Sequence, residues 1–147
     1  MKVEDTLFTK KISVRTKDIY STVNEVVSII SNFGDIREKK NIYETDGPRK
    51  RIERVFDIIE EVDKHYKAEI HFQLTGESNG NGLLDITISG ITQTNLEKGS
   101  GIASSAFSDF YAKNFLPTAK RGMEKKIKGM ANEIEKGVRK LEKENLI

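Results

Sequence analysis

The chain has 147 residues, carries a formal net charge of +2, and contains two His and no Cys. This length is that of a single domain, which can bury a core without covalent cross-links. The absence of Cys excludes disulfides and thiolate metal sites, and two His alone do not complete a structural zinc site. Positive and negative residues alternate along the chain, which does not favour a nucleic-acid partner. We therefore expect no cofactor, no metal and no nucleic acid.

The N-terminal segment MKVEDTLFTK has acidic residues where a secretory signal has an apolar core. No apolar run approaches the length of about 18 residues that indicates a membrane span. We expect a soluble cytoplasmic protein with no integral membrane association. The composition, with 33% charged residues and no Cys, also resembles that of thermophile proteins.

Residues 7–34 predict a strand followed by an amphipathic helix. Phe8, Ile12 and Val14 share one face of a period-two pattern, which Lys10 interrupts. From Thr16, a candidate N-cap, apolar residues then recur at helical spacing, and Gly34 supplies the stop. The helical stripe consists of Ile19, Val23, Val26, Val27, Ile30 and Phe33. Residues 36–45 predict a further strand, closed by the turn Asp-Gly-Pro.

Residues 49–65 support two interpretations. As a helix they form one amphipathic stripe of Ile52, Val55, Phe56, Ile59 and Val62. As a strand they place Ile52, Phe56 and Ile58 on one face, with Arg54 between them. Periodicity favours the helix, whereas the β-branched and aromatic composition favours the strand.

The strand interpretation has a consequence for assembly. It puts Val55 and Ile59 on the other face, as an apolar pair that a monomer would expose to water. We expect that face to be covered by a second subunit, as in a homodimer, or by a chain terminus.

The next two segments predict a β-meander. Residues 66–74 alternate without interruption through Tyr66, Ala68, Ile70, Phe72 and Leu74. The sequence ESNGNG at 77–82 then supplies a tight turn, because its Asn-Gly pairs accept positive φ. The strand that follows puts Leu84, Ile86, Ile88 and Gly90 on one face.

The last third predicts a long helix with two opposed apolar stripes. The first stripe consists of Ala103, Phe107, Phe110, Tyr111 and Phe115. The second consists of Leu116, Ala119, Met123, Ile127, Met130, Ile134, Val138 and Leu141, nearly opposite at about 100° per residue. One straight helix cannot bury both against one sheet. We expect a kink or break within two residues of Pro117, because proline lacks a backbone donor and restricts the residue before it.

This order of elements resembles the START-like helix-grip superfamily, also called SRPBCC. The resemblance rests on FTKKISVRTKDIYSTVNEVVSII at 8–30 and on NFLPTAKRGMEKKIKGMANEIEKGV at 114–138. It implies one domain spanning 1–147 of the α+β class, in which a curved antiparallel sheet of about five strands wraps the long C-terminal helix. Many members have more strands. The resemblance also implies that residues 50–61 form a strand, and that a ligand cavity lies between sheet and helix.

From this resemblance we expect a small apolar or amphipathic molecule, such as a lipid, to bind between sheet and helix. The expected sheet wall is Phe56, Phe72, Ile86 and Ile88, and the expected helix wall is Phe107, Tyr111 and Phe115. Apolar walls with a few polar groups are typical of ligand sites, although aromatic residues also dominate ordinary cores. The alternative is a non-enzymatic protein-interaction module whose interior is filled by its own side chains.

Polar motifs support no catalytic assignment. His65, Lys67, Glu69 and His71 share one strand face, but the two His lie about 20 Å apart along a strand, which favours a solvated face over a metal site. The Gly-containing segments 46–50 and 98–105 lack the Gly-Lys-Ser/Thr ending of a nucleotide loop. We found no arrangement of residues typical of a nucleophile or of paired carboxylates, so the sequence favours a binding protein over an enzyme.

Overall fold

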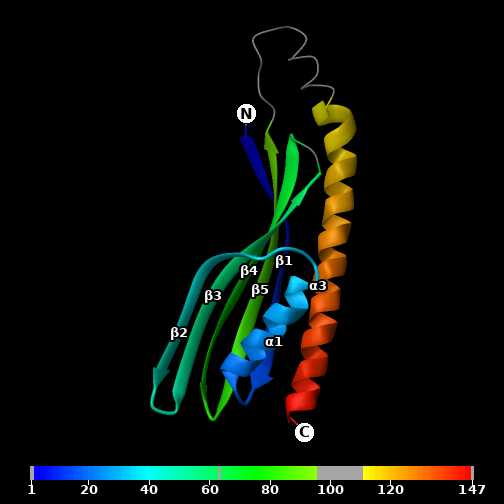
Figure 1. Ribbon diagram of the computed structural model, residues 1–147. Helices are drawn as coiled ribbons and strands as arrows, with labels where there is room; N and C mark the ends of the chain where they lie inside the picture. Colours follow the sequence, from blue (N-terminus) through cyan, green and yellow to red (C-terminus); the bar gives the residue numbers. More distant parts are fainter. Residues whose placement is uncertain (1, 63, 96–110, 147) are drawn as a thin grey trace.

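The computed structural model describes residues 2–62, 64–95 and 111–146 of the chain. The elements are β1 (Lys2–Thr16), α1 (Ile19–Ser31), β2 (Arg37–Asp46), β3 (Arg49–Glu61), β4 (Tyr66–Asn79), β5 (Asn81–Asn95), the π-helical turn η1 (Tyr111–Phe115) and α3 (Leu116–Leu146) (Figure 1). The strands form one antiparallel sheet in the order β1-β5-β4-β3-β2. A curved five-stranded sheet, a helix after the first strand and a long C-terminal helix are the fold class that the sequence predicts.

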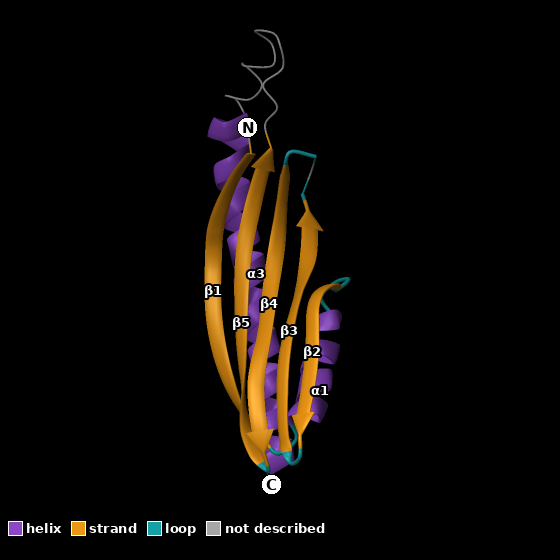
Figure 2. Cartoon of the chain, turned by 90° about the vertical axis from the view of Figure 1, so that its left-hand side faces the viewer, coloured by secondary structure: helices purple, strands orange, loops and turns teal. Residues whose placement is uncertain are grey.

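Both helices lie on the same face of the sheet (Figure 2). We call this the inner face and the opposite one the outer face. α3 runs along the length of the sheet and packs mainly against β1, while α1 packs against β3, β4 and β5 near the C-terminal end of α3. No helix in the described ranges is long and apolar enough to cross a membrane.

Residues 49–61 form a strand, which settles the ambiguity of that segment. β3 pairs with β2 on one side and with β4 on the other, so its backbone N–H and C=O groups are hydrogen-bonded to both neighbours. Ile52, Phe56 and Ile58 are buried on the inner face. Arg54 lies between them in sequence and forms an ion pair with Glu38 at 2.7 Å. Tertiary pairing therefore overrides the helical periodicity.

The N-terminus of α1 differs from the prediction that Thr16 caps it. The helix begins at Ile19, and Asp18 caps it by accepting a hydrogen bond from the backbone N–H of Tyr20 at 3.2 Å. Thr16 instead ends β1, and its buried hydroxyl lies 2.6 Å from that of Thr22. The prediction was wrong because a carboxylate two residues further on takes the capping role.

The backbone changes character next to Pro117. The π-helical turn η1 ends at Phe115, and α3 begins at Leu116. The predicted irregularity is thus present as a change of helix type, but α3 continues through Pro117 without a break. Pro117 lies where the π-helical turn passes into α3, so the backbone donor that proline lacks falls at a position where the hydrogen-bond pattern already changes.

Two glycines in the sheet allow the helices to approach it closely. A Cβ on Gly76 of β4 would lie 2.6 Å from Ile19 Cδ1 of α1 and 2.4 Å from the carbonyl oxygen of Leu83. A Cβ on Gly90 of β5 would lie 2.7 Å from Ile127 Cδ1 of α3. Both distances are shorter than real Cβ contacts. Each helix therefore contacts the sheet at a position without a side chain.

We expect Gly76→Ala to lower the free energy of unfolding by about 1–3 kcal/mol, because the new methyl group meets a backbone oxygen that cannot move independently. Gly90→Ala should cost less, since the atom it meets is the end of a side chain. Gly122→Ala is the matched control: it lies on α3 with nothing within 4 Å, and should be stabilising by up to about 1 kcal/mol. Urea denaturation measures all three, and equal effects at Gly76 and Gly122 would contradict the close approach.

Candidate functional site

The four residues predicted as the sheet wall lie in the core. Phe56, Phe72, Ile86 and Ile88 are buried on the inner face of three adjacent strands. The rings of Phe56 and Phe72 stack with their centroids 5.2 Å apart, directly opposite each other in the register. Each such side chain contributes about 1.5–3 kcal/mol by burial. These residues form the half of the interior nearer the turn between β4 and β5, which we call the lower half. Gly90 of β5 and Ile127 of α3 meet at its upper limit.

The predicted helix wall is described only at its C-terminal end. Phe115 lies immediately before α3, and 37% of its surface is exposed. Phe107 lies outside the described residues, as does the side chain of Tyr111. The second stripe is on the sheet side of α3: Leu116, Met123, Ile127, Met130, Ile134 and Val138 are all buried. The described residues of the second stripe are therefore mostly buried, whereas Phe115, the described residue of the first stripe, is partly exposed.

The inner face changes from apolar to polar above the contact between Gly90 and Ile127. The register aligns Glu60 of β3, Ala68 of β4, Thr92 of β5 and Asp5 of β1 in one row, which we call the polar row. Two lysines of α3 reach it. Lys120 Nζ lies 2.6 Å from Asp5 Oδ2, and Lys126 Nζ lies 3.0 Å from Glu60 Oε2. Ion pairs therefore join the first half of α3 to the edge strand β1 and to β3.

Tyr66 lies one row above, opposite Thr94, and is buried. Burial raises the pKa of its phenol above the ordinary value, and a hydrogen bond with Thr92 acts in the opposite direction. The phenol therefore stays protonated at neutral pH. This end of the interior consequently has hydroxyl and ammonium donors next to buried apolar surface.

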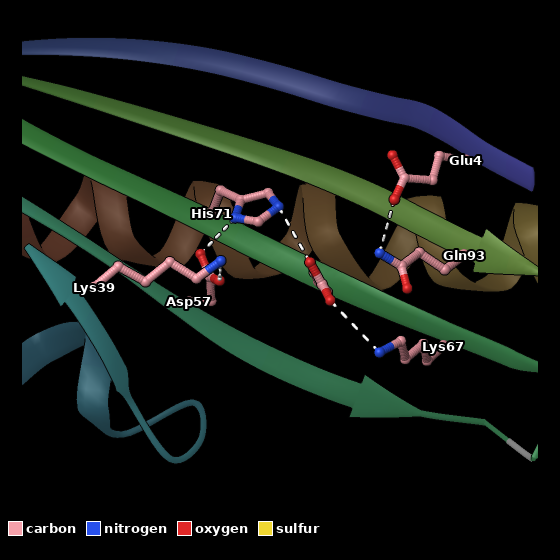
Figure 3. Close-up of polar contacts among 7 residues, drawn as sticks. Glu4, Lys39, Asp57, Lys67, His71 and Gln93 are labelled. Atoms are coloured by element: carbon pink, nitrogen blue, oxygen red, sulfur yellow. Dashed lines mark hydrogen bonds and ion pairs between the residues drawn. The ribbon is translucent and has the colours of Figure 1, made fainter.

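A second polar cluster lies on the outer face, on β2, β3 and β4 (Figure 3). Asp57 of β3 stands directly opposite His71 of β4, and His71 Nδ1 contacts its Oδ1 atom. His71 Nε2 lies 3.4 Å from Glu69 Oε2, and Lys39 Nζ lies 2.8 Å from Asp57 Oδ2. Only 3% of the Asp57 side chain is exposed. We call Asp57, Glu69 and His71 the outer cluster.

The carboxylate of Asp57 stabilises the charged form of the neighbouring Lys39. It raises the pKa of Lys39, first through their hydrogen bond and then through the attraction of opposite charges. Lys39 itself is 56% exposed and lies at a β-bulge, where the pairing of β2 with β3 shifts between Glu38 and Lys40. A bulge redirects a side chain, and here that side chain reaches the buried carboxylate.

Sequence reasoning found part of the outer cluster and missed Asp57. Glu69 and His71 were expected on one solvated face together with His65 and Lys67. They do share the outer face, but Asp57 of the neighbouring strand joins them there. Only the register between β3 and β4 brings it opposite His71. A single aspartate within an apolar strand segment was the available signal.

A surface pocket of about 330 Å³ lies at the end of the sheet where β3 ends, β4 begins and β5 ends. Its lining is mostly polar and includes Glu61, Lys64, Lys67 and Gln93. Lys67 also lies 3.6 Å from Glu69, so the pocket and the outer cluster are neighbours. Gln93 donates a hydrogen bond to Glu4 Oε1 at 2.9 Å (Figure 3).

No protein-family model matches this sequence, and no curated protein matches it significantly. Solved structures resemble the chain distantly. A protein from Rhizobium leguminosarum is 9% identical with a TM-score of 0.31, and the match covers 95% of this chain and 99% of that one. A protein from Helicobacter pylori is 10% identical with a TM-score of 0.35, covering 91% and 86%. A START superfamily protein from Mycobacterium smegmatis is 11% identical with a TM-score of 0.21, covering 90% and 98%. Likeness at this level does not identify a function.

Lys39→Gln should lower the thermal unfolding midpoint more than the matched control Lys40→Gln. The first removes the ammonium group from a buried carboxylate, whereas the second removes it from Glu53, which is more accessible to water. Because the folded pKa of Lys39 is raised, its contribution is fully present below the ordinary value of 10.5 and is lost as pH rises through the folded pKa.

The measurement is a melting series from pH 7 to pH 12 on parent and variants. The difference between parent and Lys39→Gln should be constant near neutrality and shrink at the alkaline end. Equal effects of the two substitutions at pH 7 would contradict a special role for the buried carboxylate.

Proposed function

We propose that the protein binds a small amphipathic molecule between the sheet and the first half of α3. The observation that carries the proposal is the change of the inner face from apolar rows to the polar row beneath Lys120 and Lys126. A molecule with an apolar body and a polar end matches such a gradient, because apolar walls supply affinity and a few polar groups fix orientation. The START-like resemblance of the sequence points to the same location.

The two ends of the proposed site differ in chemistry. The contact of Ile127 with Gly90 closes the apolar end of the site, and the expected sheet wall of Phe56, Phe72, Ile86 and Ile88 supports that end from the packed core behind it. The polar end of the ligand meets the hydroxyls of Tyr66 and Thr92 and the ammonium group of Lys120. Of the aromatic wall that the sequence predicts, Phe115 is the member whose side chain is described, and we place it at the opening. The partly exposed ring of Phe115 supports this assignment, because an aromatic side chain at a site entrance buries further apolar surface when ligand is present.

Small side chains also support this position. Ala68 of β4 and Gly90 of β5 lie in adjacent rows of the sheet. Ile127 of α3 contacts the row that contains Gly90. Met123 is the next buried residue towards the start of α3, and an unbranched thioether adapts to guests of different shape. The proposal is therefore of a carrier or sensor of lipid-like molecules without catalysis.

Titration with a fluorescent fatty-acid analogue tests the proposal. The parent should bind one probe per chain in a saturable manner. Phe115→Ala should weaken binding about tenfold, a loss of about 1.4 kcal/mol, with little change in the thermal midpoint. Tyr43→Ala is the matched control, because Tyr43 on β2 is a ring of similar exposure, 39%, far from α3 in the sheet order. It should leave probe binding unchanged.

Ala68→Leu distinguishes an open interior from a filled one. If ligand occupies the polar end of the interior, the larger side chain takes its place, and the variant should fold normally without binding the probe. In an interior already filled by the protein itself, the same substitution overpacks the core and costs about 1–3 kcal/mol. A parent that does not bind the probe, together with a destabilised Ala68→Leu variant, would refute the carrier and favour the interaction module.

A homodimer through the outer face is a second candidate function. The register puts Val55 opposite Gln73 and Ile59 opposite Glu69, so both apolar side chains lie on the outer face beside Asp57. Both are half-buried within the single chain. Replacing both with Lys should lower the sedimentation coefficient if a second copy covers them. Gln73→Lys, on the same face, is the control, and a parent that already sediments as a monomer would exclude this candidate.

A further inference from the structure

We infer that the outer cluster is a binding site for a divalent transition-metal ion of the Zn²⁺ type. One donor atom from each of Asp57, Glu69 and His71 lies within 4.8 Å of the other two. An imidazole with two carboxylates is a donor set that Zn²⁺ accepts, with water in the fourth position, whereas Mg²⁺ and Ca²⁺ prefer oxygen alone. The site is on the opposite face from the proposed ligand site and is independent of it.

The backbone holds the donors in place before an ion arrives. Asp57 and His71 are directly opposite each other on β3 and β4, both of which have strand neighbours on both sides. Glu69 is two residues before His71 on β4, so its side chain emerges on the same face. Donors around tetrahedral Zn²⁺ are about 3.4 Å apart, given metal–ligand distances near 2.1 Å. Three donor atoms that already lie within 4.8 Å of one another are close to that spacing.

Burial favours an ion over water at this position. The side chains of Asp57, Glu69 and His71 are 3%, 16% and 28% exposed, so the carboxylates are poorly solvated and gain from a cation. Lys39 supplies that positive charge in the structure, at 2.8 Å from Asp57. Lys39 is more exposed than the three residues of the outer cluster and lies at the β-bulge, so it can move into solvent when an ion replaces it. Lys39 is therefore a competitor for the site.

This competition gives the inference a distinctive test. Calorimetric titration of Zn²⁺ into chelator-treated protein at pH 7 should give one ion per chain. His71→Ala and Glu69→Gln should each weaken binding by at least about tenfold, in line with losses on disturbing metal shells. Lys39→Ala should tighten it, because the competing ammonium group is gone. A purely electrostatic or structural cluster predicts no such gain.

His65→Ala is the matched control, because it removes the chain's other imidazole, which lies just before β4 and contacts the carbonyl oxygen of Asn95, and it should leave the Zn²⁺ affinity unchanged. Circular dichroism checks that each variant is folded, and the absorption of bound Co²⁺ should lose its ligand-field bands in His71→Ala. Three results would overturn the inference: no binding by the parent, equal loss in His65→Ala and His71→Ala, or a Lys39→Ala variant that binds no more tightly than the parent.

Discussion

The contact between Ile127 of α3 and Gly90 of β5 sets the distance between the long helix and the sheet, and the rest of the interior depends on it. Gly90 stands in a row with Ile58, Ile70 and Phe8, and α3 can approach this row closely because Gly90 has no side chain. Below the row the inner face is mostly apolar and covered by both helices, although Lys10 of β1 pairs there with Glu135 of α3 and Arg54 of β3 pairs with Glu38. Above it the face carries charges that pair with lysines of α3. The contact that Gly90 makes possible therefore marks the boundary between a packed core and an amphipathic region.

This division accounts for two sets of polar residues with different physical roles. Asp5 and Glu60 face α3 and join it to the sheet by ion pairs of 2.6 and 3.0 Å, which are partly exposed and individually weak. Asp57 faces the other way and is nearly buried, so its charge must be balanced by Lys39 or by a bound cation. Because the sheet separates the two regions, ligand binding on the inner face and metal binding on the outer face are independent proposals.

Local patterns predicted the elements that rest on a single chain segment. The alternation from Tyr66 to Leu74 and the helical stripe from Ile19 to Ile30 are both observed, because each reflects one buried face. Features that depend on pairing between segments were harder. Residues 49–61 have helical periodicity, yet β2 and β4 draw them into the sheet, and Asp57 meets His71 only through that register. Thr16 and Asp18 are both good capping residues, and only the end of β1 decides between them.

Amide hydrogen exchange along α3 tests the central claim most directly. If the Gly90 contact separates the two regions, amides from Ile127 to Val138 should exchange slowly with or without a fluorescent fatty-acid analogue. Amides from Ala119 to Met123 should exchange faster in the free protein and slow down when the probe is added, because local opening is easiest where few apolar contacts hold the helix. Uniform protection along α3 that the probe does not change would contradict the account.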